Sequence, residues 1–255
     1  MTRYAAMEAE PPAPGGEQIV AQNLVALFET DADLVASVLP RPLVPTEPIV
    51  RLTLAQVDMP GAEEPLGAGT FAVQCRHDGT DGFYDLLMIM NREAAVVGGR
   101  ETFGEPKKLG HAWLRHEGGE VAGVMGRQGV DLAEIRGRVA EDLEPQAYNE
   151  RSAFYFKFLL DPAGGGFDAE PELVHVRRGQ QDLVRQRVEG DVVLRDSRFD
   201  PVAELPVRSL LSIVWTESHQ TQRGEIVGRV PSEWVWPFRH QRYDGLIARL
   251  QPASR

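Results

Sequence analysis

Lysine is scarce in this chain of 255 residues, since only Lys107, Lys108 and Lys157 are lysines among its 27 basic residues. Cysteine is scarcer still. Cys75 alone cannot form an internal disulfide or a cysteine-rich metal site, and this usage is typical of a reducing cytoplasm. Basic charge is in deficit as well, because 38 acidic residues give a net charge of −11. That balance argues against nucleic acid and an anionic membrane as partners.

Long apolar runs are also absent. No stretch approaches the roughly 18 consecutive apolar residues of a membrane span, so we expect no membrane insertion. The start of the chain, Met1 to Tyr4, lacks the apolar stretch of a signal peptide, and we expect a cytoplasmic protein. Apolar residues make up 42% of the chain and charged residues 25%. These values are close to the average of soluble globular proteins, so a sizeable core can form.

The first residues differ in composition from the rest of the chain. Residues 1–17 are rich in proline and glycine and poor in apolar side chains, which predicts a flexible N-terminal arm before a single domain over residues 18–255. Thr30 to Asp33 matches a capping box, in which side-chain oxygens bond the free amides of a helix start. We predict that this helix ends before Pro40. There is no internal repeat and no linker in the middle of the chain.

Strand-like patterns dominate the remaining sequence. In the first of them Arg51 lies on the face opposite Val50 and Leu52. The segments predicted as strands are 49–57, 83–90, 93–97, 121–124, 134–139, 154–160, 173–176, 183–188 and 192–194. So many strands favour closure into a barrel, which removes free edges.

Turn and helix signals complete this prediction. Glu189 to Asp191 predicts a hairpin turn, and Asp161 to Gly166 predicts a turn or exposed loop. Pro206 fits the first turn of a helix that runs as far as Val214, and another helix starts at Ser232 and is interrupted near residue 237. The predicted fold class is α+β, mostly antiparallel β, with two to four short helices.

The segment from Val97 to Gly110 carries the most distinctive pattern, VGGRETFGEPKKLG. Pro106 fixes its own φ and biases Glu105 toward an extended backbone, so the amine of Lys107 is held on a stiff support, which suits a nucleophile. Arginine cannot replace a lysine whose amine must lose its proton, so two adjacent lysines in a lysine-poor chain suggest chemistry. The alternative for such a pair is a solvated turn. We interpret the two glycines at 98–99 as a turn, because the setting of a phosphate loop is missing.

Gly99-Arg100-Glu101, four variable residues and Pro106-Lys107-Lys108-Leu109-Gly110 together resemble the signature of the acetoacetate decarboxylase family. Pro48 to Arg51, the apolar run after Tyr84 and Leu205 to Arg208 are similar to that family as well. The resemblance covers most of the chain from about residue 20. It implies a closed or cone-like β-barrel, a homo-oligomer, no cofactor, and a small-molecule keto acid as the substrate.

The resemblance also implies that Lys107 condenses with the substrate ketone and that Lys108 is its cationic neighbour, a mode of activation established for acetoacetate decarboxylase itself. A useful neutral fraction at pH 7 requires roughly 4 to 5 kcal/mol of penalty against the ammonium form. If the segment is extended, the two amines are about 10 Å apart, where repulsion supplies only about 1.7 kcal/mol at an effective dielectric of ~20. We therefore expect burial of Lys107, against apolar walls such as residues 83–90, to contribute most and Lys108 to assist.

The chain departs from the family at the groups around the lysine. The decarboxylases carry an arginine on the first strand and glutamates on the next strands, where this chain has the neutral residues 21–23, Thr53 and 67–71. Glu63 and Glu64 precede the last of these segments and are candidate substitutes. Loss of the partner groups makes strict acetoacetate decarboxylation doubtful and leaves imine formation intact.

The resulting prediction is a lyase that forms a Schiff base between Lys107 and a keto acid, for decarboxylation or for aldol or dehydration chemistry. Lys107 and Lys108 are the candidate catalytic residues, with Arg100, Glu101, Glu64 and His111 as supporting or substrate-binding candidates. The histidines lack metal-ligand spacing, so we expect no metal site. The alternative is an inactive family member that binds a keto-acid-like small molecule.

Overall fold

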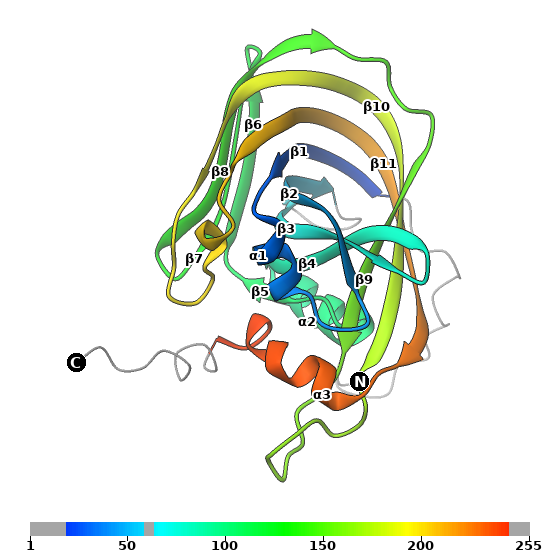
Figure 1. Cartoon of the computed structure of the whole chain (residues 1–255). Helices are drawn as coiled ribbons and strands as arrows, with labels where there is room; N and C mark the ends of the chain where they lie inside the picture. Colours follow the sequence, from blue (N-terminus) through cyan, green and yellow to red (C-terminus); the bar gives the residue numbers. More distant parts are fainter. Residues whose placement is uncertain (1–18, 59–63, 245–255) are drawn as a thin grey trace, which may run out of the picture.

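A closed barrel of seven strands forms the centre of the molecule (Figure 1). The computed structural model describes residues 19–58 and 64–244. Strand β11 pairs with both β1 and β10, which closes the ring in the order β11-β1-β2-β3-β4-β9-β10. The barrel strands are β1 (Ile19–Glu29), β2 (Val44–Asp58), β3 (Leu66–His77), β4 (Thr80–Met90), β9 (Asn149–Lys157), β10 (Glu172–Leu194) and β11 (Ser209–Arg229). The mostly antiparallel barrel confirms the predicted fold class, although β4 and β9 meet in parallel.

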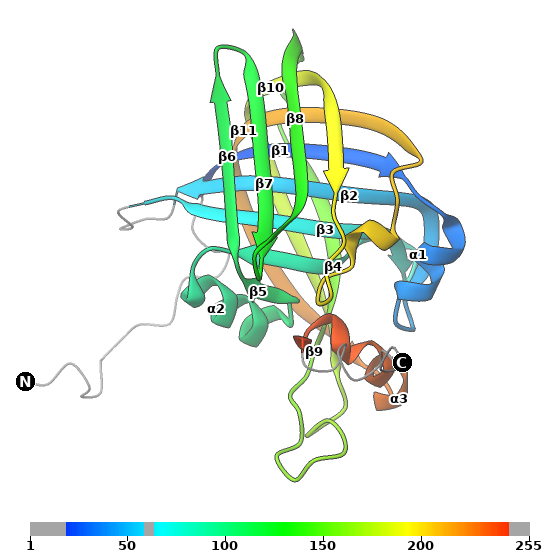
Figure 2. The same cartoon turned by 90° about the vertical axis from the view of Figure 1, so that its left-hand side faces the viewer.

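The remaining long strands form a second layer. β10 continues past its pairing with β11 and pairs through residues 186–194 with β8 (Val130–Asp142). Beyond β8 follow β7 (Glu120–Arg127) and β6 (His111–Glu117). Figure 2 shows these three strands crossing β1 to β4 on the outside of the barrel. They close the outer face of that wall.

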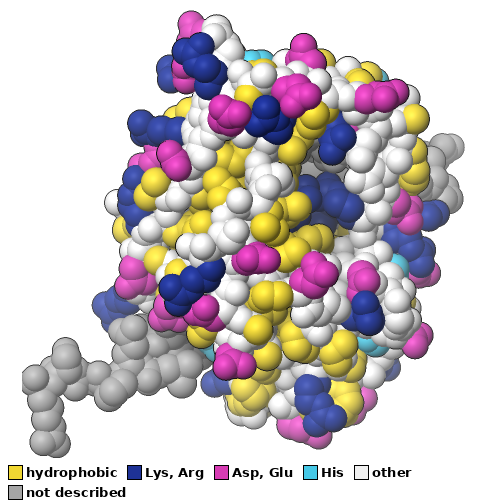
Figure 3. Space-filling view, turned by 45° about the horizontal axis from the view of Figure 1, so that its top comes forward, with side chains coloured by type: hydrophobic (Ala, Val, Ile, Leu, Met, Phe, Trp, Pro, Cys, Tyr) yellow, Lys and Arg dark blue, Asp and Glu magenta, His cyan; other side chains and the backbone are white. Residues whose placement is uncertain are grey.

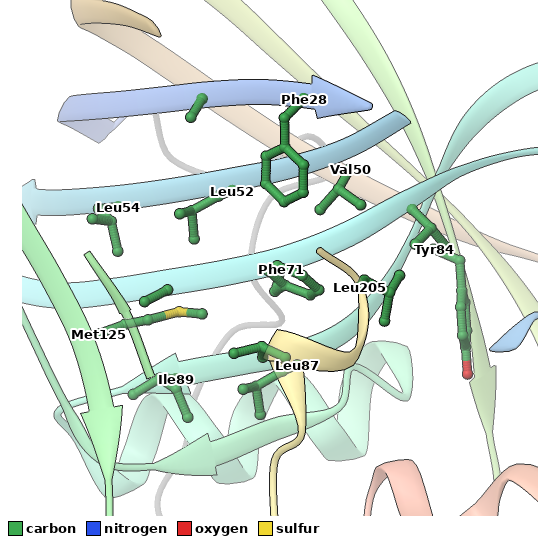
Figure 4. Packing of buried hydrophobic residues seen from close by; sticks show 14 of the residues in the cluster. Phe28, Val50, Leu52, Leu54, Phe71, Tyr84, Leu87, Ile89, Met125 and Leu205 are labelled. Atoms are coloured by element: carbon green, nitrogen blue, oxygen red, sulfur yellow. The ribbon is translucent and has the colours of Figure 1, made fainter. Parts of the chain in front are cut away.

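The main hydrophobic core lies between these two layers. Leu54, Phe71 and Met125 are completely buried there, and Figure 4 shows them with the neighbouring aliphatic side chains of the barrel wall. Each such side chain contributes about 1.5–3 kcal/mol when it is removed from water. The outer face of this barrel wall therefore supplies the main stabilising core, and the inner face can hold polar and charged side chains.

Strand β2 shows how the sequence sorts its residues between the two faces. Val50 and Leu52 are fully buried in the main core, while the alternate residues Arg51 and Thr53 face a cavity inside the barrel. This division confirms the prediction from the alternating pattern of residues 49–57, because successive side chains of a strand point to opposite faces.

Three α-helices occur among the described residues, namely α1 (Ala32–Val38), α2 (Glu93–Phe103) and α3 (Ser232–Val235). Short 3-10 segments follow at Val202–Glu204 and Trp236–Gln241. No helix in residues 19–58 or 64–244 has the length and apolar character needed to cross a bilayer. The predicted arm over residues 1–17 lies outside the described residues, so the domain boundary at residue 18 stays a prediction.

The prediction of a strand at residues 93–97 is wrong, and so is the prediction of a turn at 98–99, because both segments belong to α2. The helix ends at Gly104, which has φ of 78° and whose amide bonds the carbonyls of Arg100 and Gly99. A left-handed glycine just after the last helical turn is a common helix stop. Residues 96–97 are β-branched and favour a strand locally, but in the structure they belong to this helix.

The two predictions that follow residue 188 are also wrong. Residues 189–191 do not turn but continue β10, whose 23 residues form a single bulged strand. The helix predicted after Pro206 is the strand β11, because pairing with β1 on one side and β10 on the other overrides its helical spacing. The turn predicted from Asp161 to Gly166 is confirmed by a hydrogen bond from the Asp161 amide to the Gly166 carbonyl, 3.0 Å.

The helix predicted between Thr30 and Pro40 is present as α1, and the helix predicted from Ser232 is present as α3. The capping box is not formed, because no side chain bonds the amides at the start of α1. The Asp31 carboxylate instead accepts hydrogen bonds from Nε and Nη2 of Arg208, at 2.9 and 2.8 Å. This ion pair links α1 to the start of β11.

Candidate active site

The two adjacent lysines begin the short strand β5 (Lys107–Leu109), which runs parallel to the end of β4. Because the strand is extended, neighbouring side chains point to opposite faces. Lys107 faces the cavity inside the barrel, whereas Lys108 lies among a separate set of charged groups outside this cavity. The lysine segment is therefore extended, which is the condition under which the two amines lie apart.

Glu105 is the immediate partner of Lys107. Its Oε2 lies 2.7 Å from Nζ of Lys107, and its side chain is completely buried. Helix α2 passes directly over this pair at Gly99, where an added Cβ would lie 2.5 Å from Nζ of Lys107. The absence of a side chain at this point lets the helix lie close to the amine.

Lys108 is held in a buried ion cluster. Its Nζ lies 2.7 Å from Asp200 and 3.0 Å from Asp244, and Arg127 bonds both of the same carboxylates. The cluster holds two basic and two acidic groups, so the charge of Lys108 is compensated locally. The two lysines are neighbours in the sequence, but their side chains lie in different surroundings.

The cavity that Lys107 faces has a volume of about 390 Å³. Much of its wall is apolar or small. The residues of this kind that line it include Ala55, Ala68, Ala72, Ala153, Phe83, Met88 and Met90. The expected apolar wall from residues 83–90 is therefore present on one side, and it excludes water from part of the cavity around the amine.

Charged side chains line the rest of this cavity, and Arg178 is at their centre. Its Nη2 donates to Glu105 at 2.6 Å, and its Nη1 donates to the hydroxyl of Tyr155 at 2.9 Å. The Tyr155 hydroxyl in turn donates to Asp85 at 2.5 Å. Burial raises the pKa of the Asp85 carboxyl above its ordinary value, although Arg178 and the Tyr155 hydroxyl act in the opposite direction. A carboxyl whose pKa is raised in this way is a candidate for proton transfer within the cavity.

Two more arginines, Arg51 on β2 and Arg151 on β9, line the same cavity. Burial lowers the pKa of Arg151 to about 10 and lowers that of Arg51 well below its ordinary value. Figure 3 shows Lys and Arg side chains gathered inside a hollow on the face drawn there. Buried guanidinium groups recognise carboxylates with paired hydrogen bonds, so this cavity is suited to an anionic ligand.

The four supporting candidates lie elsewhere. Arg100 stacks on Tyr243, with 5.1 Å from its guanidinium carbon to the ring centre, and Glu101 and Glu64 are exposed. His111 lies 2.7 Å from Asp131 on the surface. None of these four is among the described residues that line the cavity of Lys107. Glu63, the other candidate substitute, lies outside the described residues.

The segments where the sequence analysis expects the arginine and glutamates of the family contribute neutral side chains to the cavity. Asn23, Thr53 and Thr70 all line it, and the last two are direct partners in the β2–β3 ladder. The amide of Asn23 donates to Thr216 at 3.3 Å. The charged groups come from other positions in the barrel instead.

Sequence reasoning did not select the five other charged residues of the cavity, namely Glu105, Asp85, Arg51, Arg151 and Arg178. Two of them carry a recognisable signal. Arg51 alternates with the buried Val50 and Leu52, and Asp85 interrupts the apolar run of residues 83–90. Within the described ranges, no three His, Cys, Asp or Glu side chains are grouped so that they could hold a metal ion.

The chain is similar to proteins named acetoacetate decarboxylase. One from Burkholderia multivorans is 28% identical over 196 residues, covering 74% of this chain and 78% of the relative. Acetoacetate decarboxylase 3 from Mesorhizobium japonicum is 26% identical over 222 residues, covering 81% and 82%.

Solved structures agree in fold. The crystal structure of acetoacetate decarboxylase from Legionella pneumophila has a TM-score of 0.75 at 20% identity, over 89% of this chain and 93% of that one. The enduracididine biosynthesis enzyme MppR complexed with pyruvate has a TM-score of 0.72 at 16% identity, over 89% and 94%.

The family described as Acetoacetate decarboxylase (ADC) matches residues 1–230. The chain therefore belongs to the acetoacetate decarboxylase family.

Proposed function

We propose that this protein is a lyase that forms an imine between Lys107 and the ketone of a keto acid. One observation carries the proposal. The Lys107 amine faces a cavity of about 390 Å³, with a carboxylate 2.7 Å from its nitrogen and arginines among the residues that line it. This arrangement combines a nucleophile, a proton acceptor and binding groups for a carboxylate.

The first step converts the lysine into a nucleophile. Glu105 is positioned to accept a proton from the Lys107 ammonium group, since the two are in contact. The neutral amine then attacks the ketone carbon and forms a carbon–nitrogen bond. The former carbonyl oxygen takes up protons and leaves as water, which produces an iminium ion on Lys107.

The iminium ion then accepts an electron pair. In a 3-oxo acid the bond to the carboxylate breaks, carbon dioxide leaves, and the pair forms an enamine. Protonation of the enamine carbon and hydrolysis by water release the ketone and restore the amine. Asp85 is the candidate proton donor, because it lines the same cavity and burial raises its pKa. In a 2-oxo acid, loss of a proton next to the iminium ion gives an enamine that can attack an aldehyde instead.

The comparisons support both reactions at the level of the family. The curated relatives are named for acetoacetate decarboxylation, and one structure of MppR holds the condensation product of pyruvate and imidazole 4-carboxaldehyde. The neutral residues Asn23, Thr53 and Thr70 in the cavity wall favour a reaction other than that of acetoacetate decarboxylase itself. They also favour the second candidate function, a binding protein without turnover.

Turnover assays separate these possibilities. We expect carbon dioxide release from 3-oxo acids, or condensation of pyruvate with an aldehyde, by the wild type and by Lys157→Arg, which alters the lysine on β9. Lys107→Arg keeps the positive charge but cannot form an imine, so it is expected to lose the reaction. Keto-acid binding without any turnover would support the binding protein. Turnover that survives Lys107→Arg would refute the role of Lys107.

The homo-oligomer implied by the family stays a prediction, and light scattering of the purified protein tests it. A mass equal to one chain would contradict it.

A further inference from the structure

The charges that line the cavity of Lys107 do not balance. The described residues that line it include four basic side chains and two carboxylates. These are Lys107, Arg51, Arg151 and Arg178 against Glu105 and Asp85. The cavity therefore carries a surplus of two positive charges when all of these groups are ionised. Protonation of Asp85, which burial favours, increases the surplus.

Both carboxylates are already engaged, Glu105 with Lys107 and Arg178 and Asp85 with Arg178 and the Tyr155 hydroxyl. Glu105 places one oxygen 2.7 Å from Lys107 and the other 2.6 Å from Arg178. Asp85 lies 4.0 Å from Arg178 and accepts the hydroxyl of Tyr155. Lys107 and Arg178 are thus the compensated cations of the cavity.

Arg51 and Arg151 are attracted by Asp85 but lack a direct ion-pair partner. Among residues 19–58 and 64–244, no carboxylate lies within 4.0 Å of the guanidinium group of either arginine. Arg151 donates to the amide oxygen of Gln180 at 3.4 Å. Arg51 packs over the ring of Phe83 at 5.9 Å. A guanidinium group without a counterion in a partly buried site is costly unless a ligand supplies the charge.

The register of the sheet places two of these positive charges directly opposite each other. Arg151 and Arg178 are direct partners in the β9–β10 ladder, and like charges directly opposite each other destabilise a sheet. Repulsion by Arg151 also contributes to the lowered pKa of Arg51, after burial. The three arginines therefore share one region of the cavity wall. One monocarboxylate neutralises only half of the surplus.

We propose that the substrate of this cavity is an oxo acid with two carboxylates. Arg51 and Arg151 select it, because these two cations have no direct contact with Glu105 or Asp85 and are available to pair with the carboxylates of the ligand. The ketone then lies toward Lys107, so this assignment rests on the proposed function for the reacting end of the substrate. The volume of about 390 Å³ falls within the range of sites that enclose drug-sized ligands. It leaves room for a longer acid than acetoacetate.

Binding of acids without a ketone tests the two-charge site independently of imine chemistry. Glutarate and pentanoate have equal chain lengths and differ in the second carboxylate. By calorimetry at constant salt, we expect glutarate to bind about 10- to 100-fold tighter, as expected for one charge-assisted contact. Arg51→Gln and Arg151→Gln should each move this ratio toward one. Arg115→Gln, which alters an exposed arginine on β6, is the matched control and should keep it.

A second pair of variants distinguishes the loss of positive charge from damage to the fold. Arg51→Lys and Arg151→Lys retain the positive charge, so they should preserve more of the preference for glutarate than the glutamine variants do. Thermal unfolding of every variant checks that the barrel has formed. A glutarate preference that is the same in the lysine and glutamine variants would overturn the assignment of these residues.

Reactive probes connect the site to Lys107. Borohydride trapping with 3-oxoglutarate should half-saturate at a concentration about 10- to 100-fold lower than with acetoacetate. Equal half-saturation, with equal binding of glutarate and pentanoate, would overturn the two-carboxylate inference and leave the imine intact. Selective binding of glutarate without any trapped adduct would support the inference and refute the proposed function.

Discussion

Gly99 offers the sharpest test of how the structure positions the reactive amine. An added Cβ at this position would lie 2.3 Å from Oε2 of Glu105 and 2.5 Å from both Nζ and Cδ of Lys107, whereas ordinary contacts begin at 3.4 Å. In Gly99→Ala the lysine side chain therefore has to move by about 1 Å, and a displacement of this size costs about 10²-fold in rate. We expect single-turnover imine formation to slow by about that factor.

The stability of the same variant should change little or in the opposite direction. Alanine is favoured over glycine by about 1 kcal/mol inside a helix, and this gain offsets the cost of moving two flexible side chains. Gly98→Ala is the matched control, because an added Cβ at this exposed neighbour in α2 meets nothing within 4 Å. It should gain the helix stability without slowing the reaction.

The assay is the rate at which borohydride captures the adduct of a keto acid, together with the midpoint of thermal unfolding. Slow trapping by Gly99→Ala with a normal unfolding midpoint is the expected result. Equal trapping rates for Gly99→Ala and Gly98→Ala would refute the idea that helix α2 fixes the position of the amine.

Three further predictions concern stability. Lys108→Met should lose about 3 kcal/mol of unfolding free energy in urea, because it breaks a buried ion cluster, yet should still trap keto acid on Lys107; loss of trapping in a folded variant would show that Lys108 acts on the amine. Burial raises the pKa of Asp85 above 3.8, so the stability that its protonated form contributes is present below pH 3.8 and is lost as the pH rises through the raised value. Unfolding free energies from pH 3 to 8 should therefore fall relative to those of Asp85→Asn, and parallel curves would contradict this. Gly190→Ala should cost about 2 kcal/mol in a urea titration, because its Cβ would collide with the backbone of β8. Gly166→Ala, whose Cβ would meet nothing within 4 Å, should cost under about 0.5 kcal/mol.

The strands with a regular pattern could be predicted from the sequence. Residues 49–57 alternate because one face of β2 packs in the main core and the other lines a cavity. The turn at Asp161 to Gly166 was also predictable, since glycine adopts positive φ there, 85° and 93° at Gly164 and Gly165. In these places local preference and tertiary structure agree.

Elsewhere, distant partners decide the local structure. Gly190 looks like a turn residue, but it is glycine because a Cβ would collide with the carbonyl of Arg136 on β8. The segment after Pro206 has helical spacing, yet both of its edges pair with strands that are far away in the sequence. Sequence patterns of a few residues do not contain these contacts.

The candidate site divides in the same way. The lysine pair and the stiff backbone before it could be found locally, because they lie within a few residues of each other. Arg51, Arg151 and Arg178 come from β2, β9 and β10 and share a cavity only because the barrel closes. Their assembly depends on strand register, as the pairing of Arg151 with Arg178 shows.

The central claim is that Lys107 forms the imine, and this chain suits a direct measurement because it has only three lysines. A keto acid and borohydride are added to the wild-type protein, and the modified peptide is identified by mass spectrometry. We predict one reduced adduct, located on Lys107, which disappears in Lys107→Arg and persists in Lys157→Arg. An adduct on Lys108 or Lys157, or one that survives in Lys107→Arg, would contradict the assignment of Lys107 as the imine-forming residue.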